Sequence, residues 1–258
     1  MLGDQYTSLN PTSSWCLVPF PSVGNNSRYA EKTCKRVLQL LEGIAAHDGF
    51  GKFVMMIFND QDTYYEYITN YYTELPVAEE LALSSGMYIN QGYGHFVFVE
   101  EDLDRVEPVI AHELTHSLLA HLPLPAWVNE GIAVNTERRL CPRSSSSLSP
   151  DELQAQFAQF WNASTIQEFW SGKAWLRPDE GNRLSYELAT TFITLAAKDD
   201  WQRFSAFVNA ADVSDSADSA AREHLGFSVA NLAEAVLGPG DWSPKPNQWS
   251  EGTERGQF

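Results

Sequence analysis

Short apolar runs and helical periodicity alternate along the first part of the chain. The runs at 15–20 ("WCLVPF") and 52–58 ("KFVMMIF") are short and apolar, and each predicts a strand. Residues 28–49 between them carry apolar side chains at helical spacing and end at a glycine, which predicts a helix. The chain therefore begins with a strand, a helix and a second strand.

A further helix and a β-hairpin are predicted next. The stretch 59–72 ("NDQDTYYEYITNYY") starts with capping-type residues and continues as a helix. Residues 86–101 ("GMYINQGYGHFVFVEE") contain two β-rich runs joined by a glycine-containing turn, which is the pattern of a hairpin. The N-terminal half thus predicts a small mixed β-sheet accompanied by helices.

From about Val106 the pattern becomes helical. Pro108 suits the first turn of a helix, and the helical periodicity then continues until Pro123 and Pro125 stop it. A second helix is predicted from about Ala126 to Arg139. These two helices follow each other with only a short proline-containing turn between them.

The rest of the chain predicts more helices and a tail. The loop after residue 140 ends in a capping box, in which Ser149 is the cap and Glu152 completes it. Further helices are predicted at 182–200, 201–211, 219–226 and 228–238. Residues 239–258 are rich in proline and glycine, and we expect docking to be what orders them.

These elements together predict an α+β protein. Its 258 residues suffice for one large domain or two small lobes. We expect an α/β lobe over 1–124 that ends in the helix from Val106, a helical lobe over 125–238, and the tail over 239–258. The site described below would lie at the junction of the two lobes.

Composition and charge exclude several classes of protein. The chain is 43% apolar and 20% charged, which is typical of a globular protein. Lys and Arg number 17 against 34 Asp and Glu, and this formal charge of −17 argues against a nucleic-acid partner, which needs a basic footprint. The three cysteines (Cys16, Cys34 and Cys141) form no Cys-x-x-Cys pair, which argues against a disulfide framework and a cysteine zinc site.

The sequence also lacks patterns of export and membrane insertion. The N-terminus ("MLGDQYTSLNPTSSWC") does not have the basic and then apolar design of a signal peptide. Nowhere do eighteen apolar residues follow one another, so no membrane span is predicted. The expected location is the cytoplasm.

The segment 111–134 ("AHELTHSLLAHLPLPAWVNEGIAV") carries the candidate chemistry. Positions i and i+4 share one face of a helix, so His112 and His116 can present two imidazoles to a single ion. Glu113 is one step round the helix, close enough to touch a water on that ion without being a ligand. The prolines turn the chain back, and Glu130 on the next helix can supply a third ligand.

Zinc suits this set of donors, because it accepts histidine nitrogen and carboxylate oxygen and a catalytic site needs three protein ligands and an open position for water. With Glu113 as the base, that water becomes a nucleophile near neutral pH. The alternative is a buried helix with chance polar residues. Ile110, Leu114 and Leu118 form an apolar stripe on another face, so we expect both faces to be buried. Buried histidines and glutamates need partners, and one zinc ion per chain would satisfy them all.

The segments "AHELTHSLL" and "LPAWVNEGIAV" resemble the gluzincin zinc metallopeptidases, most of all the small peptidase MA-like group with its W-x-x-E-G segment. The resemblance extends loosely over residues 50–238. It implies a gluzincin-like fold, with His112, His116 and Glu130 as zinc ligands and Glu113 as the base. It also implies that Tyr186 stabilises the transition state.

The same resemblance places "HFVFVE" where the family has its substrate-lining edge strand. We therefore expect an extended peptide to pair with the strand near residues 95–99, with His95, Phe96 and Val97 as substrate-binding residues.

The chain departs from the family at one position. Thermolysin-like members have an aspartate four residues after the ligand glutamate, which supports a ligand histidine. Val134 stands there in this chain. Asn135, Glu137 or another segment would have to take over this support.

The sequence therefore predicts a zinc-dependent metallopeptidase that hydrolyses peptide or protein substrates through a water activated by Glu113. Two alternatives stay open at this point. One is a zinc hydrolase or lyase that acts on a small molecule, which a deep closed pocket would favour. The other is a non-catalytic scaffold or regulator, which a closed shell of four ligands would favour.

Overall fold

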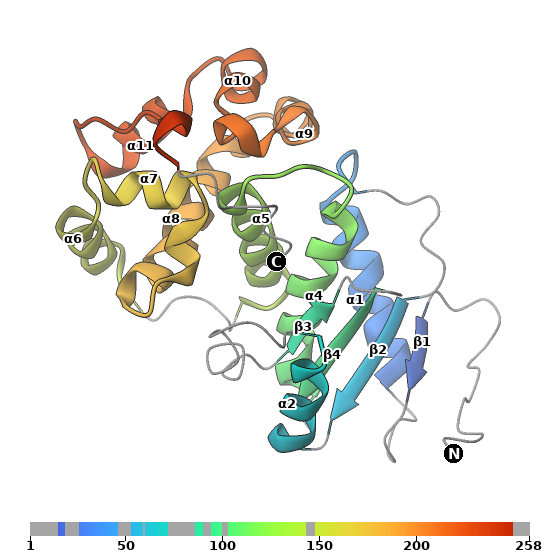
Figure 1. Ribbon diagram of the computed structural model, residues 1–258. Coiled ribbons are helices and arrows are strands. Elements are labelled where there is room, and N and C mark those ends of the chain that lie inside the picture. The colour runs from blue at the N-terminus through green and yellow to red at the C-terminus, as the bar shows by residue number, and fades with distance from the viewer. Residues whose placement is uncertain are drawn as a thin grey trace. The chain divides into compact units, whose positions relative to one another are not determined.

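The computed structural model describes residues 15–18, 26–45, 53–58, 60–71, 86–89, 94–99, 103–142 and 148–249. The chain divides into two compact units: Met1–Leu41 with His47–Leu118, and Glu42–Ala46 with Leu119–Phe258. The structure is mostly helical with one small mixed sheet, and this agrees with the predicted α+β class (Figure 1). In the part of the chain that the structure describes, no helix is long and apolar enough to cross a membrane.

The first unit contains a sheet of four strands in the order β1-β2-β4-β3. Strands β1 and β2 are parallel, as are β2 and β4, whereas β3 runs antiparallel to β4. The bounds are Trp15–Val18 for β1, Phe53–Phe58 for β2, Gly86–Ile89 for β3 and His95–Val99 for β4. The predicted strands, the hairpin and the mixed character of the sheet are therefore confirmed.

The prediction that β4 is an edge strand is wrong. Its backbone pairs with β2 on one side and with β3 on the other, so no row of its N–H and C=O groups is open to a peptide. The side chains of His95, Phe96 and Val97 are buried, with exposed fractions of 5%, 1% and 0%. The edges of the described sheet are β1 and β3, and β3 is only four residues long.

The two faces of this sheet carry different side chains because residues alternate along each strand. On one face, helix α2 (Gln61–Thr69) packs through Tyr64 and Ile68. The buried core cluster on this side consists of Phe58, Tyr64, Ile68, Met87, Ile89 and Val97. On the other face, Gly86 lies so close to helix α4 (Leu103–Leu119) that an added Cβ would come within 2.7 Å of Val109 Cγ1. The added Cβ would also clash with Phe98 Cδ1, so glycine leaves room there for the side chains of Phe98 and Val109.

Helix α1 (Asn26–Leu40) is joined to α4 by polar contacts. Arg36 Nη1 lies 2.9 Å from Glu107 Oε1, and the Thr33 hydroxyl donates to the same oxygen over 3.1 Å. The helix ends earlier than the periodicity predicted, because a turn follows Leu40 and Gly43 has a left-handed φ of 84°. This contact with α1 holds the second turn of α4, the helix that carries the histidines.

Helix α4 begins before its proline. It starts at Leu103, so Pro108 lies inside the helix and not in its first turn. A proline at this position has no N–H to give to the carbonyl of residue 104, but the helix continues through it to Leu119. The predicted apolar stripe is confirmed, because Ile110, Leu114 and Leu118 are each at most 2% exposed.

The second unit is made of helices. Helix α5 (Ala126–Leu140) confirms the predicted bounds within one residue and packs on α8 (Glu180–Ala196). The capping box of Ser149 and Glu152 at the start of α6 is also confirmed. The other helices are α6 (Pro150–Phe160), α7 (Thr165–Trp170), α9 (Trp201–Ala210), α10 (Asp218–Ala220) and α11 (Val229–Leu237).

The first part of the predicted tail is docked on this unit. Trp242 is only 7% exposed, and its backbone carbonyl accepts the indole N–H of Trp170 over 2.8 Å. Gln167 holds the same segment at three points: its amide donates to Ser243 O, and its oxygen accepts from the Lys245 N–H and the Trp249 indole. Docking against α7 is thus the physical reason why residues 239–249 are ordered.

Candidate metal centre

The two histidines of the candidate site lie on the same face of α4. His112 and His116 are one helical turn apart, and their ring centroids are separated by 4.8 Å at an interplanar angle of 74°. His116 is buried at 7% exposed, whereas His112 is half-buried. The apolar stripe of α4 fixes the rotation of the helix about its axis, and this rotation sets where the histidine side chains point.

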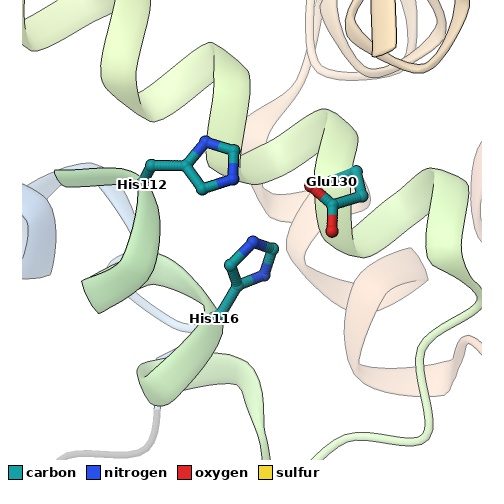
Figure 2. Close-up of side chains that lie close together, drawn as sticks. All are labelled: His112, His116 and Glu130. Atoms are coloured by element: carbon teal, nitrogen blue, oxygen red, sulfur yellow. The ribbon is translucent and has the colours of Figure 1, made fainter. Parts of the chain in front are cut away.

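Glu130 comes from the second turn of α5 and is 5% exposed. The potential ligand atoms of His112, His116 and Glu130 all lie within 4.8 Å of one another. Figure 2 shows the two imidazoles and the carboxylate directed toward one another. Among the described residues this is the group of histidine, cysteine and acidic side chains that could hold a metal ion.

These donors fit zinc. Two imidazole nitrogens and one carboxylate oxygen are ligands that zinc accepts, and three protein ligands leave one position of a tetrahedron open. Ligands at about 2.1 Å from a common tetrahedral ion lie roughly 3.4 Å apart. The three donors, within 4.8 Å of one another, are close to that separation. The burial of His116 and Glu130 limits competition from bulk water at the ligands.

Glu113 is not one of the three grouped donors. Its Oε2 accepts the backbone N–H of Tyr88 over 2.8 Å, so the carboxylate is anchored to strand β3. This bond fixes the direction in which the carboxylate points.

The position of α5 depends on the glycine that follows Glu130. A Cβ at Gly131 would lie 2.6 Å from Ile193 Cγ1 and 2.7 Å from the backbone oxygen of Ala189. Helices α5 and α8 therefore approach each other at backbone distance at this point. The glycine costs the helix some stability in isolation, and close packing is the reason it is tolerated there.

We expect Gly131→Ala to lower the stability of the protein by about 1–3 kcal/mol, because α8 presents a backbone atom that cannot rotate away. The same change should weaken zinc binding, because α5 must move and Glu130 moves with it. The measurements are urea unfolding and a zinc affinity from competition with a chelator. Unchanged unfolding would show that the two helices can separate without cost.

Asn135, one of the residues that could have supported a ligand histidine, joins two helices of the second unit. Asn135 donates from Nδ2 to the carbonyls of Gly131 and Thr190, and its Oδ1 accepts from the Thr194 hydroxyl. These bonds tie α5 to α8. Val134 is buried at 7% exposed, and its apolar side chain gives no hydrogen bond to a histidine. In this structure Asn135 thus supports the helix of Glu130, and a role for Glu137 stays a prediction.

Tyr186 and His95, two further predicted site residues, lie on different elements. Tyr186 is half-buried in α8, where its ring meets that of Trp175 edge-on with the centroids 6.2 Å apart. Its catalytic role stays a prediction, as does a site at the junction of the two lobes. His95 faces α2, since its Nε2 is 2.9 Å from the hydroxyl of Tyr67, and it therefore belongs to the opposite face of the sheet from α4.

Sequence reasoning missed two contributors to this region. The Tyr88 N–H is a backbone donor, and a pattern of side chains in the sequence cannot predict its contact with Glu113. Gly131 is visible in the sequence, and a glycine inside a predicted helix is the signal that could have indicated close packing.

No family model, curated protein or solved structure matches this chain. The interpretation of the site therefore depends on its own residues and geometry.

Proposed function

We propose that this protein is a zinc-dependent peptidase of gluzincin type, which uses one zinc ion per chain. The observation that supports this most is the combination of His112, His116 and Glu130 as a three-donor group with a further glutamate beside it. Glu113 is anchored to Tyr88 and is not a member of that group, as a general base should be.

When bound, zinc lowers the pKa of water and polarises a carbonyl oxygen. His112, His116 and Glu130 would hold the ion and leave one position open. The Glu113 carboxylate takes a proton from the attacking water as the new C–O bond forms. The same carboxyl group then gives this proton to the leaving amine as the C–N bond breaks. Glu113 is thus returned to its charged form at the end of each turnover.

The substrate strand would pair with β3, in place of the position at β4 that the sequence suggested. Of the two edge strands in the described sheet, β3 contacts Glu113 through Tyr88. An extended peptide that adds to β3 would pass beside the proposed base, and its main chain would supply hydrogen bonds that do not depend on its sequence. This supports a peptide as substrate over a compact small molecule.

The test is to purify the protein without added metal, measure its zinc content and digest an unbiased peptide library with it. We expect about one zinc per chain and cleavage that a chelator abolishes and added zinc restores. Zinc without cleavage of any peptide would favour a scaffold, and turnover of small esters or amides alone would favour a small-molecule hydrolase. Absence of zinc binding would overturn the proposal.

A further inference from the structure

The start of α5 is fastened to a loop almost ninety residues later in the chain. The indole N–H of Trp127 lies 3.2 Å from the carbonyl oxygen of Ser216 and 3.1 Å from its hydroxyl. That hydroxyl donates in turn to the carbonyl of Trp170 over 3.1 Å. Trp127 and Ser216 are completely buried, so these hydrogen bonds are shielded from water.

The loop that receives Trp127 has an unusual backbone. Ser216 and Ala217 have φ angles of 56° and 64°, a region that residues with a side chain seldom adopt. The loop is held in this form by its own bonds, since the Ala217 N–H donates to Asp212 O. Its Val213 N–H donates to the carbonyl of Pro123, within the turn between α4 and α5. The loop 212–217 is therefore hydrogen-bonded to the chain on both sides of the start of α5, at Pro123 before it and at Trp127 within it.

The start of α5 has no side-chain cap of its own. The N-cap of α5 is Pro125, which offers no side-chain hydrogen bond, and the first turn contains no acidic residue. The first turn of a helix has N–H groups without intrahelical partners and frays easily unless something holds it. Glu130 follows Trp127 by three residues, just under one turn, so any loosening at Trp127 reaches the carboxylate.

We infer that Trp127, through Ser216, is a positioning residue for the third metal ligand. The inference rests on the proposed zinc site. In this role Trp127 does not contact the metal ion. It keeps the first turn of α5 in place, so that the Glu130 carboxylate is already positioned in the metal-free protein. Metal affinity depends on such outer contacts, and their loss commonly costs 10- to 100-fold in affinity.

The chain offers a matched control in Trp170. This residue is as deeply buried as Trp127, its ring lies 6.0 Å from that of Trp127, and its indole N–H also donates to a backbone carbonyl, that of Trp242. It belongs to α7 and not to α5. Trp127→Phe and Trp170→Phe therefore remove the same atoms from the same core, and both should lower the melting temperature.

The experiment measures two quantities for the full-length wild type and both variants. The first is amide hydrogen exchange over residues 126–130 in metal-free protein, and the second is zinc affinity by chelator competition. We expect faster exchange and about tenfold or weaker zinc binding in Trp127→Phe alone. Trp170→Phe should stay within about twofold of wild type in both, because it keeps the backbone carbonyl that accepts from Ser216 and loses only an indole N–H bonded to Trp242.

Equal effects in the two variants would overturn the inference, because they would show only a general loss of core packing. A wild type that binds no zinc would instead overturn the proposed function, and the exchange data would still decide whether Trp127 holds the first turn. Should Trp127→Phe not fold, Ser216→Ala removes one of the two acceptors with less loss of volume. Its control is Ser185→Ala, a buried serine of α8 whose hydroxyl donates to Gly181 O.

Discussion

Replacing Glu113 with glutamine is expected to lower peptide turnover by about 10²–10⁴-fold, the usual contribution of a general base. Glutamine keeps the shape of the side chain, and its amide oxygen can still accept the N–H of Tyr88. What it loses is the ability to take up a proton at neutral pH. Because Glu113 lies outside the three-donor group, zinc content and melting temperature should change little.

Glu107→Gln is the matched control for this substitution. Glu107 belongs to the same helix, and its carboxylate is engaged by Arg36 and Thr33. We expect this variant to lose some stability and to keep its turnover. Full turnover in a zinc-loaded Glu113→Gln protein would exclude Glu113 as the base, and an equal loss in both variants would point to a damaged helix.

Replacing Glu130 with glutamine should weaken zinc binding by about 10²–10³-fold. Binding free energies of about 10–16 kcal/mol for four-ligand zinc sites correspond to roughly 2.5–4 kcal/mol for each ligand, and 1.4 kcal/mol is a factor of ten. The carboxamide is nearly isosteric, so the buried position is not emptied. Equilibrium dialysis with radioactive zinc, or competition with a chromogenic chelator, measures the change.

Glu187→Gln tests whether any buried glutamate of the second unit would have this effect. Glu187 is 8% exposed and forms a two-point ion pair with Arg138, with distances of 2.8 and 3.1 Å. Breaking a buried pair should lower the stability of this variant, but its zinc affinity should match wild type. Undiminished zinc binding in Glu130→Gln would mean that a different residue is the third ligand.

The parts of the fold that the sequence predicted correctly are those with local signals. The apolar stripe of Ile110, Leu114 and Leu118 set the helix of the motif, and Pro125 marked the start of the next helix. The capping box of Ser149 and Glu152 is a pattern of four residues, and it was formed as expected. Each of these signals is complete within one or two turns of chain.

The predictions that were wrong concern the position of β4 in the sheet and the end of α1. In both cases the local pattern allows two structures, and contacts with distant residues decide between them. A hairpin pattern is the same whether β4 is at the edge or in the middle, and the deciding partner is β2, about forty residues earlier. The helix at 28–49 contains one glycine at 43 and ends with another at 49, and periodicity alone favoured the second. The helix ends at Leu40, a turn leads to Gly43, and the Gly43 carbonyl accepts hydrogen bonds from Ser205 and Asn209.

The same distinction applies to the candidate site. The spacing of His112 and His116 is local, and Glu130 needed only the inference that the prolines reverse the chain. The contacts that hold these residues are remote: Trp127 and Ser216 are 89 residues apart, and Asn135 and Thr190 are 55 apart. A single sequence shows the ligand residues of a site, because their spacing is local. It does not show the remote contacts that hold these residues in place.

The hydrogen bond from Tyr88 to Glu113 would set the order of events in the proposed reaction. A single N–H serves one strong acceptor at a time, so an incoming main chain that uses the Tyr88 N–H must displace the Glu113 carboxylate from it. Binding of a peptide to the edge of β3 and release of the Glu113 carboxylate from Tyr88 would then occur together. The resting protein would keep its base tethered, and a chain too short to reach Tyr88 would leave it so.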